Sequence, residues 1–356
     1  MSTDPSRSHC VVALLADIPT TGHLGDAQAE RFTLKGDDLA ARSAGFLDFS
    51  ARHLAAGRKV IALYPQWHSE EAERAVQFAR LSLGTDHIAG IDVDIAPLAL
   101  SLMADQLAYL APYLPSGLVA SLVDELPQHM LSGGWMKSVS GLSTIPITLK
   151  QHVGSYLPTT TFLAFCTPVK RVGRVKDDNP APNIPQRPME PVQILVSAPE
   201  KVEHSDFNDQ FIPSLGCQMA GGLPEQPLGW KYWGTTKYVE FVAFSAHPQA
   251  LTHPVKSIRA TPCLWCREPI SAGVICRFCR GANQLPAGRP PKQGADVPAP
   301  PAKTTGEHIR PSWVAQQSSS ADGRTQRPPA RQGNTGTGPQ SQSTDPADST
   351  PPAPRS

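Results

Sequence analysis

Two Cys-x-x-Cys pairs stand nine residues apart in this chain, Cys263 with Cys266 and Cys276 with Cys279. Each pair predicts a tight turn that brings two thiolates to one point, and the segment between the pairs is long enough for a small hairpin. Together the four sulfur atoms predict a tetrahedral metal site. Thiolate softness and this geometry favour structural Zn²⁺, and an iron centre of the rubredoxin type or regulatory disulfides are the alternatives.

Residues 261–281 resemble a short zinc-ribbon module, in which the four cysteines take the ligand positions. This sequence has Arg267 and Arg280 directly after the two pairs, where such modules often have glycine. So short a segment cannot bury a core, so the metal must supply its folding energy, of order ~10 kcal/mol. The resemblance implies a metal with no open coordination position. It implies recognition of DNA, RNA or protein, or a purely structural clip.

Composition divides the rest of the chain. Residues 285–356 consist largely of Pro, Gln, Ser, Thr and Gly, and such a segment buries too little apolar surface to fold, so we predict a disordered tail. Prolines and charges at 168–191 predict a linker or a long surface loop. The other predicted parts are an α/β domain at 1–167, a small β-rich region at 192–254 and the ribbon at 255–284.

The first part alternates apolar runs of strand length with segments of helical periodicity. Residues 10–16, 59–65 and 87–94 predict buried strands, and the segments between them predict amphipathic helices. Such alternation favours a mainly parallel sheet that is covered on both faces. We expect the strand predicted at 159–166 to complete this sheet.

Three acidic residues follow these strands, Asp17 after the first and Asp92 and Asp94 at the end of the third. Ligands gather at the carboxyl ends of parallel strands, and the period-two spacing of Asp92 and Asp94 points both carboxylates to one side. Such a pair can share a divalent metal for phosphoryl or nucleotidyl transfer. The surrounding segment resembles the front of primase-polymerase domains, which implies that activity. The alternative is that Asp92 caps the next helix and Asp94 is a solvated loop residue.

The charge is unevenly distributed. Residues 1–167 contain 11 Lys and Arg against 16 Asp and Glu, and residues 168–356 contain 21 against 15, although the whole chain has a formal net charge of +1. A polyanion should therefore approach the second half. Within the ribbon, the side chains expected to contact nucleic acid or a partner are Trp265, Arg267, Arg277, Phe278 and Arg280.

These features predict a zinc-binding protein that recognises nucleic acid, of the kind used in bacterial or mobile-element DNA maintenance. A metal-dependent transferase built on Asp92 and Asp94 is one alternative, and a scaffold that docks protein partners through the ribbon and tail is another. The sequence lacks the phosphate-loop, dinucleotide-binding and nucleophile-elbow motifs of ordinary NTPases, dehydrogenases and hydrolases. No export signal or membrane-spanning run is evident, which predicts a cytoplasmic protein without a membrane partner.

Overall fold

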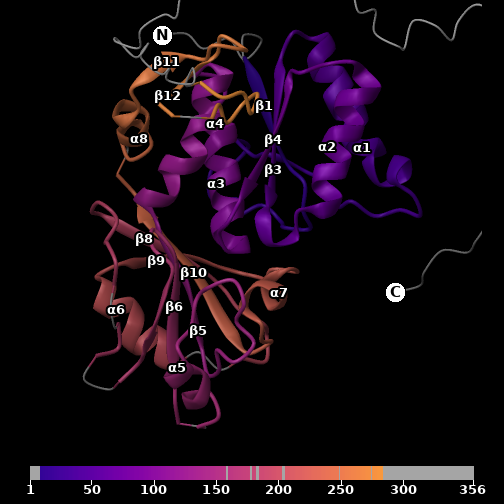
Figure 1. The fold of residues 1–356 in the computed structure, drawn as a ribbon. Helices are drawn as coiled ribbons and strands as arrows, with labels where there is room; N and C mark the ends of the chain where they lie inside the picture. The colour runs from indigo at the N-terminus through magenta and orange to yellow at the C-terminus, as the bar shows by residue number, and fades with distance from the viewer. Residues whose placement is uncertain are drawn as a thin grey trace, which may run out of the picture. The chain divides into compact units, whose positions relative to one another are not determined.

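A computed structural model describes residues 9–283, apart from residues 158, 177–178, 182–183, 203–204, 248 and 274. These residues form two sheets with their helices and a small hairpin, as Figure 1 shows. The tail predicted to be disordered, 285–356, lies outside the described residues.

The first sheet is parallel throughout and has the strand order β2-β1-β3-β4. Its strands are β1 (Cys10–Leu14), β2 (Glu30–Arg31), β3 (Lys59–Pro65) and β4 (Ile88–Val93). The strands predicted at 10–16, 59–65 and 87–94 are thereby confirmed, because each is an apolar run that both faces of a covered parallel sheet can bury.

Two helices cover each face of this sheet (Figure 1). Helices α1 (Leu39–Ala55) and α2 (Glu70–Leu83) pack against Ala13 and Leu15, and helices α3 (Pro97–Leu110) and α4 (Ser116–Glu125) pack against Val12 and Leu14. The alternation along β1 follows from the two-residue period of a strand. Short helical turns, η2 (Gln66–His68) and η3 (Leu126–His129), follow β3 and α4.

The second sheet is mixed, with the strand order β7-β6-β5-β10-β8-β9, and only β8 and β9 run parallel. Its strands are β5 (Leu131–Met136), β6 (Phe162–Thr167), β7 (Arg171–Arg174), β8 (Val192–Ser197), β9 (Gln218–Leu223) and β10 (Tyr238–Ser245). The expectation that the strand near 159–166 completes the first sheet is wrong, because β6 pairs with β5 and β7. This sheet draws strands from both sides of the predicted linker, and the predicted domain boundaries remain a prediction.

Helix α3 joins the two sheets. Val242 and Phe244 of β10 belong to the same apolar core as α3, and the buried Glu240 accepts a hydrogen bond of 2.7 Å from the backbone amide of Leu98. Burial raises the pKa of Glu240 to about 7, although the Leu98 amide opposes this shift. The carboxyl group therefore caps the first turn of α3 from the neighbouring sheet, and β10 is held against the end of the first layer.

The other elements complete the layers. On the second sheet, η4 (Phe207–Phe211) and α6 (Ile212–Leu215) cover one face, and Tyr232 and Trp233 of α7 (Gly229–Trp233) are fully buried in a core on β5 and β6. Helices α5 (Leu149–Gly154) and α8 (Thr252–Ser257) precede β6 and the cysteine hairpin, whose strands are β11 (Ala260–Pro262) and β12 (Pro269–Ser271). Within the described residues, no helix is both long and apolar enough to cross a bilayer.

Candidate metal site and ligand pocket

The four cysteines of the hairpin meet at one point. Their sulfur atoms all lie within 4.8 Å of one another, with 3.7 Å between Cys263 and Cys279 and 3.8 Å between Cys266 and Cys276. Thiolates ~2.3 Å from a tetrahedral Zn²⁺ lie about 3.8 Å apart, so the donor set fits such an ion. Among the described residues, this is the one group of three or more His, Cys, Asp or Glu side chains close enough to hold a metal.

Backbone amides surround the sulfur atoms. The amides of Trp265, Cys279 and Gly281 each donate to a cysteine sulfur at 3.4 Å. Burial alone would raise the Cys263 pKa, but hydrogen bonds from the backbone amides of Cys266 and Trp265 lower that pKa to about 7. At Cys263 these dipoles favour thiolate, the form that binds metal, whereas burial raises the pKa of Cys266 and of Cys276.

The residue directly after each pair of cysteines has a left-handed backbone conformation. The φ angles of Arg267 and Arg280 are +62° and +61°, the region that glycine adopts without strain. Their backbone amides donate to the carbonyls of Cys263 and Cys276, at 3.1 and 2.8 Å, and these bonds close the two turns around the sulfurs. The glycine that zinc ribbons often have here is replaced by arginine without loss of the turn, at a cost of about 1–3 kcal/mol per residue.

The cysteine hairpin packs on the chain's own α/β layer. Arg277 forms a two-point ion pair with Asp124 of α4, at 2.8 and 2.6 Å. Arg280 donates to the hydroxyl of Tyr64 at 2.9 Å and to the carbonyl of Gly90 at 3.0 Å. Two of the arginines expected to meet phosphate are therefore engaged within the protein.

The aromatic side chains of the hairpin differ in exposure. Phe278, expected to contact a partner, is 2% exposed and lies beneath the ammonium group of Lys59. Trp265 is 70% exposed, and its indole N–H donates to the Ala282 carbonyl at 2.6 Å. Of the five predicted contact residues, only Trp265 and Arg267 present exposed side chains with no ion pair to the α/β layer among the described residues.

The three carboxylates named as catalytic candidates each meet a cation of the protein. Asp17 pairs with Lys35 at 3.2 Å, Asp94 pairs with Lys170 at 2.6 Å, and the guanidinium of Arg280 lies 3.7 Å from Asp92. Among the described residues, no group of three or more metal ligands includes any of these carboxylates, which counts against the transferase alternative. Neither Asp92 nor Asp94 caps α3, whose first turn is capped by Glu240.

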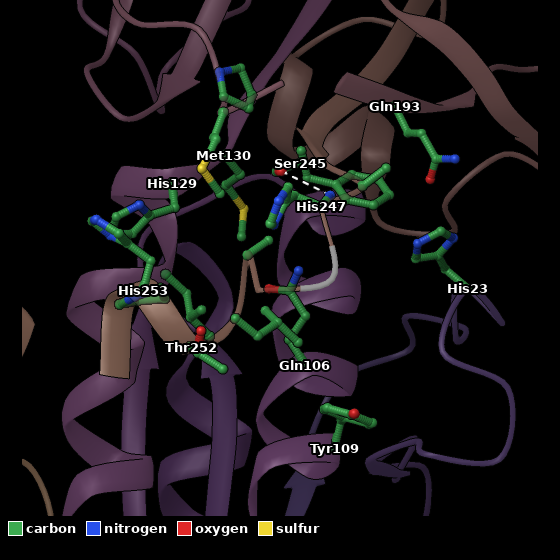
Figure 2. A pocket seen from close by; sticks show the side chains of 18 of the residues that line it. His23, Gln106, Tyr109, His129, Met130, Gln193, Ser245, His247, Thr252 and His253 are labelled. Carbon is green, nitrogen blue, oxygen red and sulfur yellow. Dashed lines mark hydrogen bonds between the residues drawn. The ribbon is translucent and has the colours of Figure 1, made fainter. Parts of the chain in front are cut away.

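A cavity of about 640 Å³ lies where α3, η3 and α8 meet the end of β10. Figure 2 shows its polar side chains converging from these elements. Its apolar wall consists of Leu24, Tyr109, Leu110, Leu126, Met130, Pro188, Met189, Phe244, Ala246, Ala250, Leu251 and Pro254. The polar lining residues are His23, Gln106, His129, Gln186, Arg187, Gln193, Ser245, His247, Thr252 and His253. The lining thus contains one arginine and four histidines and no carboxylate.

Gln106 is the buried polar group of this cavity. Its side chain is 7% exposed, and its carbonyl oxygen has no hydrogen-bond partner among the described residues. Figure 2 shows the amide in the middle of the cavity, between the histidines. A buried amide without a partner costs roughly 1–3 kcal/mol, so this group favours a ligand or water that can donate to it.

The histidines line the cavity from separate segments. The rings of His129 and His253 lie 5.4 Å apart, and the ring of His23 packs edge-on against Phe244 at 4.7 Å. Burial lowers the pKa of His23 and of His129, and the neighbouring His253 lowers the latter further. At neutral pH these rings are uncharged, and each carries one N–H that can donate to an acceptor.

A buried carboxylate holds the loop that carries His23. Asp105 is 1% exposed and accepts hydrogen bonds from both threonine hydroxyls of the loop, Thr20 at 2.9 Å and Thr21 at 3.2 Å. It also pairs with Arg31 at 2.6 Å. This cavity was not predicted from the sequence, and its one signal there was the polar pair Asp105–Gln106 inside an otherwise apolar helix.

Comparison with known proteins finds fold likenesses at low identity. No protein-family model matches the sequence, and no curated protein is significantly similar to it. A DegV family protein from Corynebacterium glutamicum is 12% identical over 68% of this chain and 98% of its own, with a TM-score of 0.47. A stearic acid-binding protein from Eubacterium ventriosum is 11% identical over 66% and 98%, with a TM-score of 0.46. DegV from Bacillus subtilis, a fatty acid binding protein, is 9% identical over 67% and 99%, with a TM-score of 0.42.

The prediction of nucleic-acid recognition and of a DNA-binding ribbon is wrong, and so is the prediction of a protein-docking scaffold. Arg277, Arg280 and Phe278 contact the chain's own α/β layer instead of an external partner.

Proposed function

We propose that the protein binds a small amphiphile, with a long apolar part and an anionic end, in the cavity between α3, η3, α8 and β10. The observation that carries this proposal is the lining of that cavity, in which an apolar wall surrounds a few polar groups, among them four histidines, Arg187 and the amide of Gln106. Specific ligand sites combine apolar walls with a few placed polar groups in this way, and ~300–1,000 Å³ is their usual size.

Charge favours an anionic end. The cavity lining contains Arg187 and no aspartate or glutamate, and the carboxylate that acts on His129, Glu125, is not among the lining residues. The backbone amide of Gln249 donates to Nδ1 of His247 at 3.1 Å, which leaves Nε2–H of that ring as a donor. Arg187 donates to the carbonyl of Ser214 at 3.0 Å, and this bond anchors the guanidinium near the rim.

Titration with a fluorescent long-chain carboxylic acid tests this function. We expect saturable binding of one probe per chain, and weaker binding of the alcohol with the same chain length. Ala250→Phe fills the cavity and should abolish binding, whereas Ala55→Phe on the exposed side of α1 should leave it unchanged. Probe binding that is unsaturable, or equal in the two variants, would contradict the proposal.

We propose, second, that the four cysteines hold a structural Zn²⁺ in a ribbon-like hairpin. The sulfur separations and the amide hydrogen bonds support it, and four protein ligands leave no open position for a substrate. Elemental analysis of protein purified under reducing conditions should give one zinc per chain, and an absorption spectrum would reveal iron. Folded protein with four metal-free thiols would exclude the site.

A further inference from the structure

The cysteine hairpin and the ligand cavity share two structural elements. Helix α8 contributes Thr252, His253 and Pro254 to the cavity wall and ends two residues before β11 of the hairpin. Helix α4 continues directly into η3, which contributes Leu126 and His129 to the same cavity. The hairpin is therefore connected to two walls of the cavity: α8 links it to one wall, and α4 with η3 links it to the other.

The hairpin binds the first turn of α4 through the carboxylate of Glu268. A carboxylate oxygen of Glu268 accepts a hydrogen bond of 2.8 Å from the amide of Gly117, and the other carboxylate oxygen pairs with Lys59. The side chains of Glu268 and Lys59 are 13% and 24% exposed. A carboxylate at a helix N-terminus satisfies a free amide and opposes the positive end of the helix dipole.

The hairpin backbone lies directly against this turn. A Cβ atom on Gly117 would lie 2.5 Å from the carbonyl oxygen of Pro269, which is shorter than any tolerated contact. Farther along the helix, the amide of Ser271 donates to the hydroxyl of Ser121 at 3.0 Å, and Arg277 pairs with Asp124. The contacts at residues 117, 121 and 124 follow the helical repeat, so one whole face of α4 is occupied by the hairpin.

Metal binding holds this contact surface together. Ile270 and Phe278 are each 2% exposed and belong to the core formed with α3 and α4, although the strands of the hairpin have only three residues each. Strands this short cannot keep two apolar side chains buried without the metal that folds the segment. Loss of the metal should therefore remove the contacts of the hairpin with α4. It should at the same time free α8, which is connected to the hairpin along the chain.

We propose that occupancy of the cysteine site by its metal sets the affinity of the cavity for its ligand. This inference rests on the proposed function. In this structure, η3 and α8 hold His129 and His253 with their rings 5.4 Å apart at the cavity wall, and we expect metal binding to keep them there. In the metal-free form the two walls separate, and the ligand loses the enclosed surface.

Thermodynamic linkage makes the coupling reciprocal. If the metal tightens ligand binding by some factor, the ligand tightens metal binding by the same factor. We expect a factor of about tenfold or more, within the roughly 5- to 150-fold range of such couplings. Both directions can be measured with the full chain.

The experiment removes the metal with a strong chelator in reducing buffer and follows amide hydrogen exchange and probe binding. We expect faster exchange at residues 117–129 and 252–257, unchanged exchange in α1 and α2, and about tenfold weaker binding of the fluorescent long-chain acid. Adding the acid to metal-loaded protein should slow metal transfer to the chelator by a similar factor.

Two variants sharpen the result without removing a ligand to the metal. Glu268→Gln should retain the metal, speed exchange at the first turn of α4 and weaken probe binding, whereas Arg259→Ala, an exposed neighbour, should change none of these. Unchanged exchange at 126–129 and 252–257 after verified metal loss would overturn the inference. A probe that binds neither form would instead contradict the proposed function, because the exchange result does not depend on it.

Discussion

The cysteine hairpin and the ligand cavity represent two ways of making a site. The hairpin's four sulfur ligands lie between residues 263 and 279, whereas the cavity lining extends from residue 23 to residue 254. In the hairpin, spacing along the chain determines which atoms meet. In the cavity, the packing of two sheets determines which side chains meet, so the lining residues form no sequence motif.

The two sites also depend on different forces. With the proposed metal bound, the hairpin depends on metal–sulfur bonds and on one partly buried carboxylate, Glu268, at the N-terminus of α4. The cavity depends on apolar packing around the buried amide of Gln106, whose carbonyl oxygen has no partner among the described residues. Perturbations of the hairpin should therefore change stability most, and perturbations of the cavity should change binding most.

The largest effect is expected from Cys276→Ser. Loss of one thiolate should release the metal and lower the free energy of unfolding by more than about 4 kcal/mol, as measured by urea denaturation. Cys217→Ser, at a half-buried cysteine of the second sheet's edge, is the matched control and should cost less than about 1 kcal/mol. Equal costs in the two variants would show that the hairpin depends on packing alone.

Gly117→Ala tests the contact between hairpin and helix without touching the sulfurs. The added methyl group meets the Pro269 carbonyl, so we expect a loss of about 1–3 kcal/mol of stability with the metal retained. Gly222→Ala in β9 is the control, since a Cβ there has no neighbour within 4 Å. Urea midpoints and elemental analysis measure both. An unchanged midpoint in Gly117→Ala would mean that the hairpin does not pack on α4.

Gln106→Leu separates binding from stability in the cavity. Loss of the NH2 group of this side chain, which can donate to the carboxylate of the long-chain acid, should weaken binding roughly threefold to tenfold, the equivalent of one hydrogen bond. Stability should stay the same or rise, because an unpartnered buried carbonyl is removed. Gln77→Leu, at an exposed position on α2, should leave the affinity of the probe unchanged. A large loss of stability in Gln106→Leu would assign the amide to structure instead.

Replacing the two arginines of positive φ by glycine should change stability by smaller amounts, and the two changes should have opposite signs. Arg267→Gly should stabilise the protein by about 0–2 kcal/mol, because the relief of about 1–3 kcal/mol of strain at positive φ is partly offset by the roughly 0.5–1 kcal/mol of chain entropy that glycine loses on folding. Arg280→Gly gains the same relief but loses the hydrogen bonds to Tyr64 and Gly90, so we expect a net loss. Thermal denaturation of the two variants side by side measures the difference, and equal shifts would show that Arg280 contributes nothing to docking.

The smallest effect is the pH dependence of the cavity. Burial lowers the pKa of His23 and of His129 below the ordinary 6.5, and at His129 the nearby His253 lowers it and Glu125 raises it. At these two histidines the unfolded chain binds protons more readily, so their contribution to stability should fall as the pH drops through 6.5 and below. Glu240, whose pKa burial raises to about 7, contributes with the opposite sign. The test is therefore the difference between the wild type and His129→Gln in urea midpoints at pH 7.5 and 5.5, and an identical pH dependence in the two proteins would contradict this assignment.

Several elements of the fold followed from the sequence, because their causes are local. The apolar runs at 59–65 and 87–94 became adjacent parallel strands, as their lengths and flanking helices predicted. The sheet to which β6 belongs could not be predicted, because the sequence of an apolar strand allows it to pair in either sheet. Its pairing with β5 places it in the second sheet. The interpretation of Asp92 and Asp94 failed for a similar reason: their cations, Arg280 and Lys170, come from distant segments.

The sequence by itself determined that four cysteine sulfurs can meet, because two tight turns nine residues apart bring their thiolates together whatever surrounds them. Only the tertiary structure decided what the hairpin does. It bonded Arg277 and Arg280 to groups of the α/β layer and buried Phe278, and it placed Gln106 and the histidines around one cavity. The physical reason is that a turn depends on bonds between near neighbours, whereas a docking face or a cavity depends on which buried surfaces of distant segments fit each other.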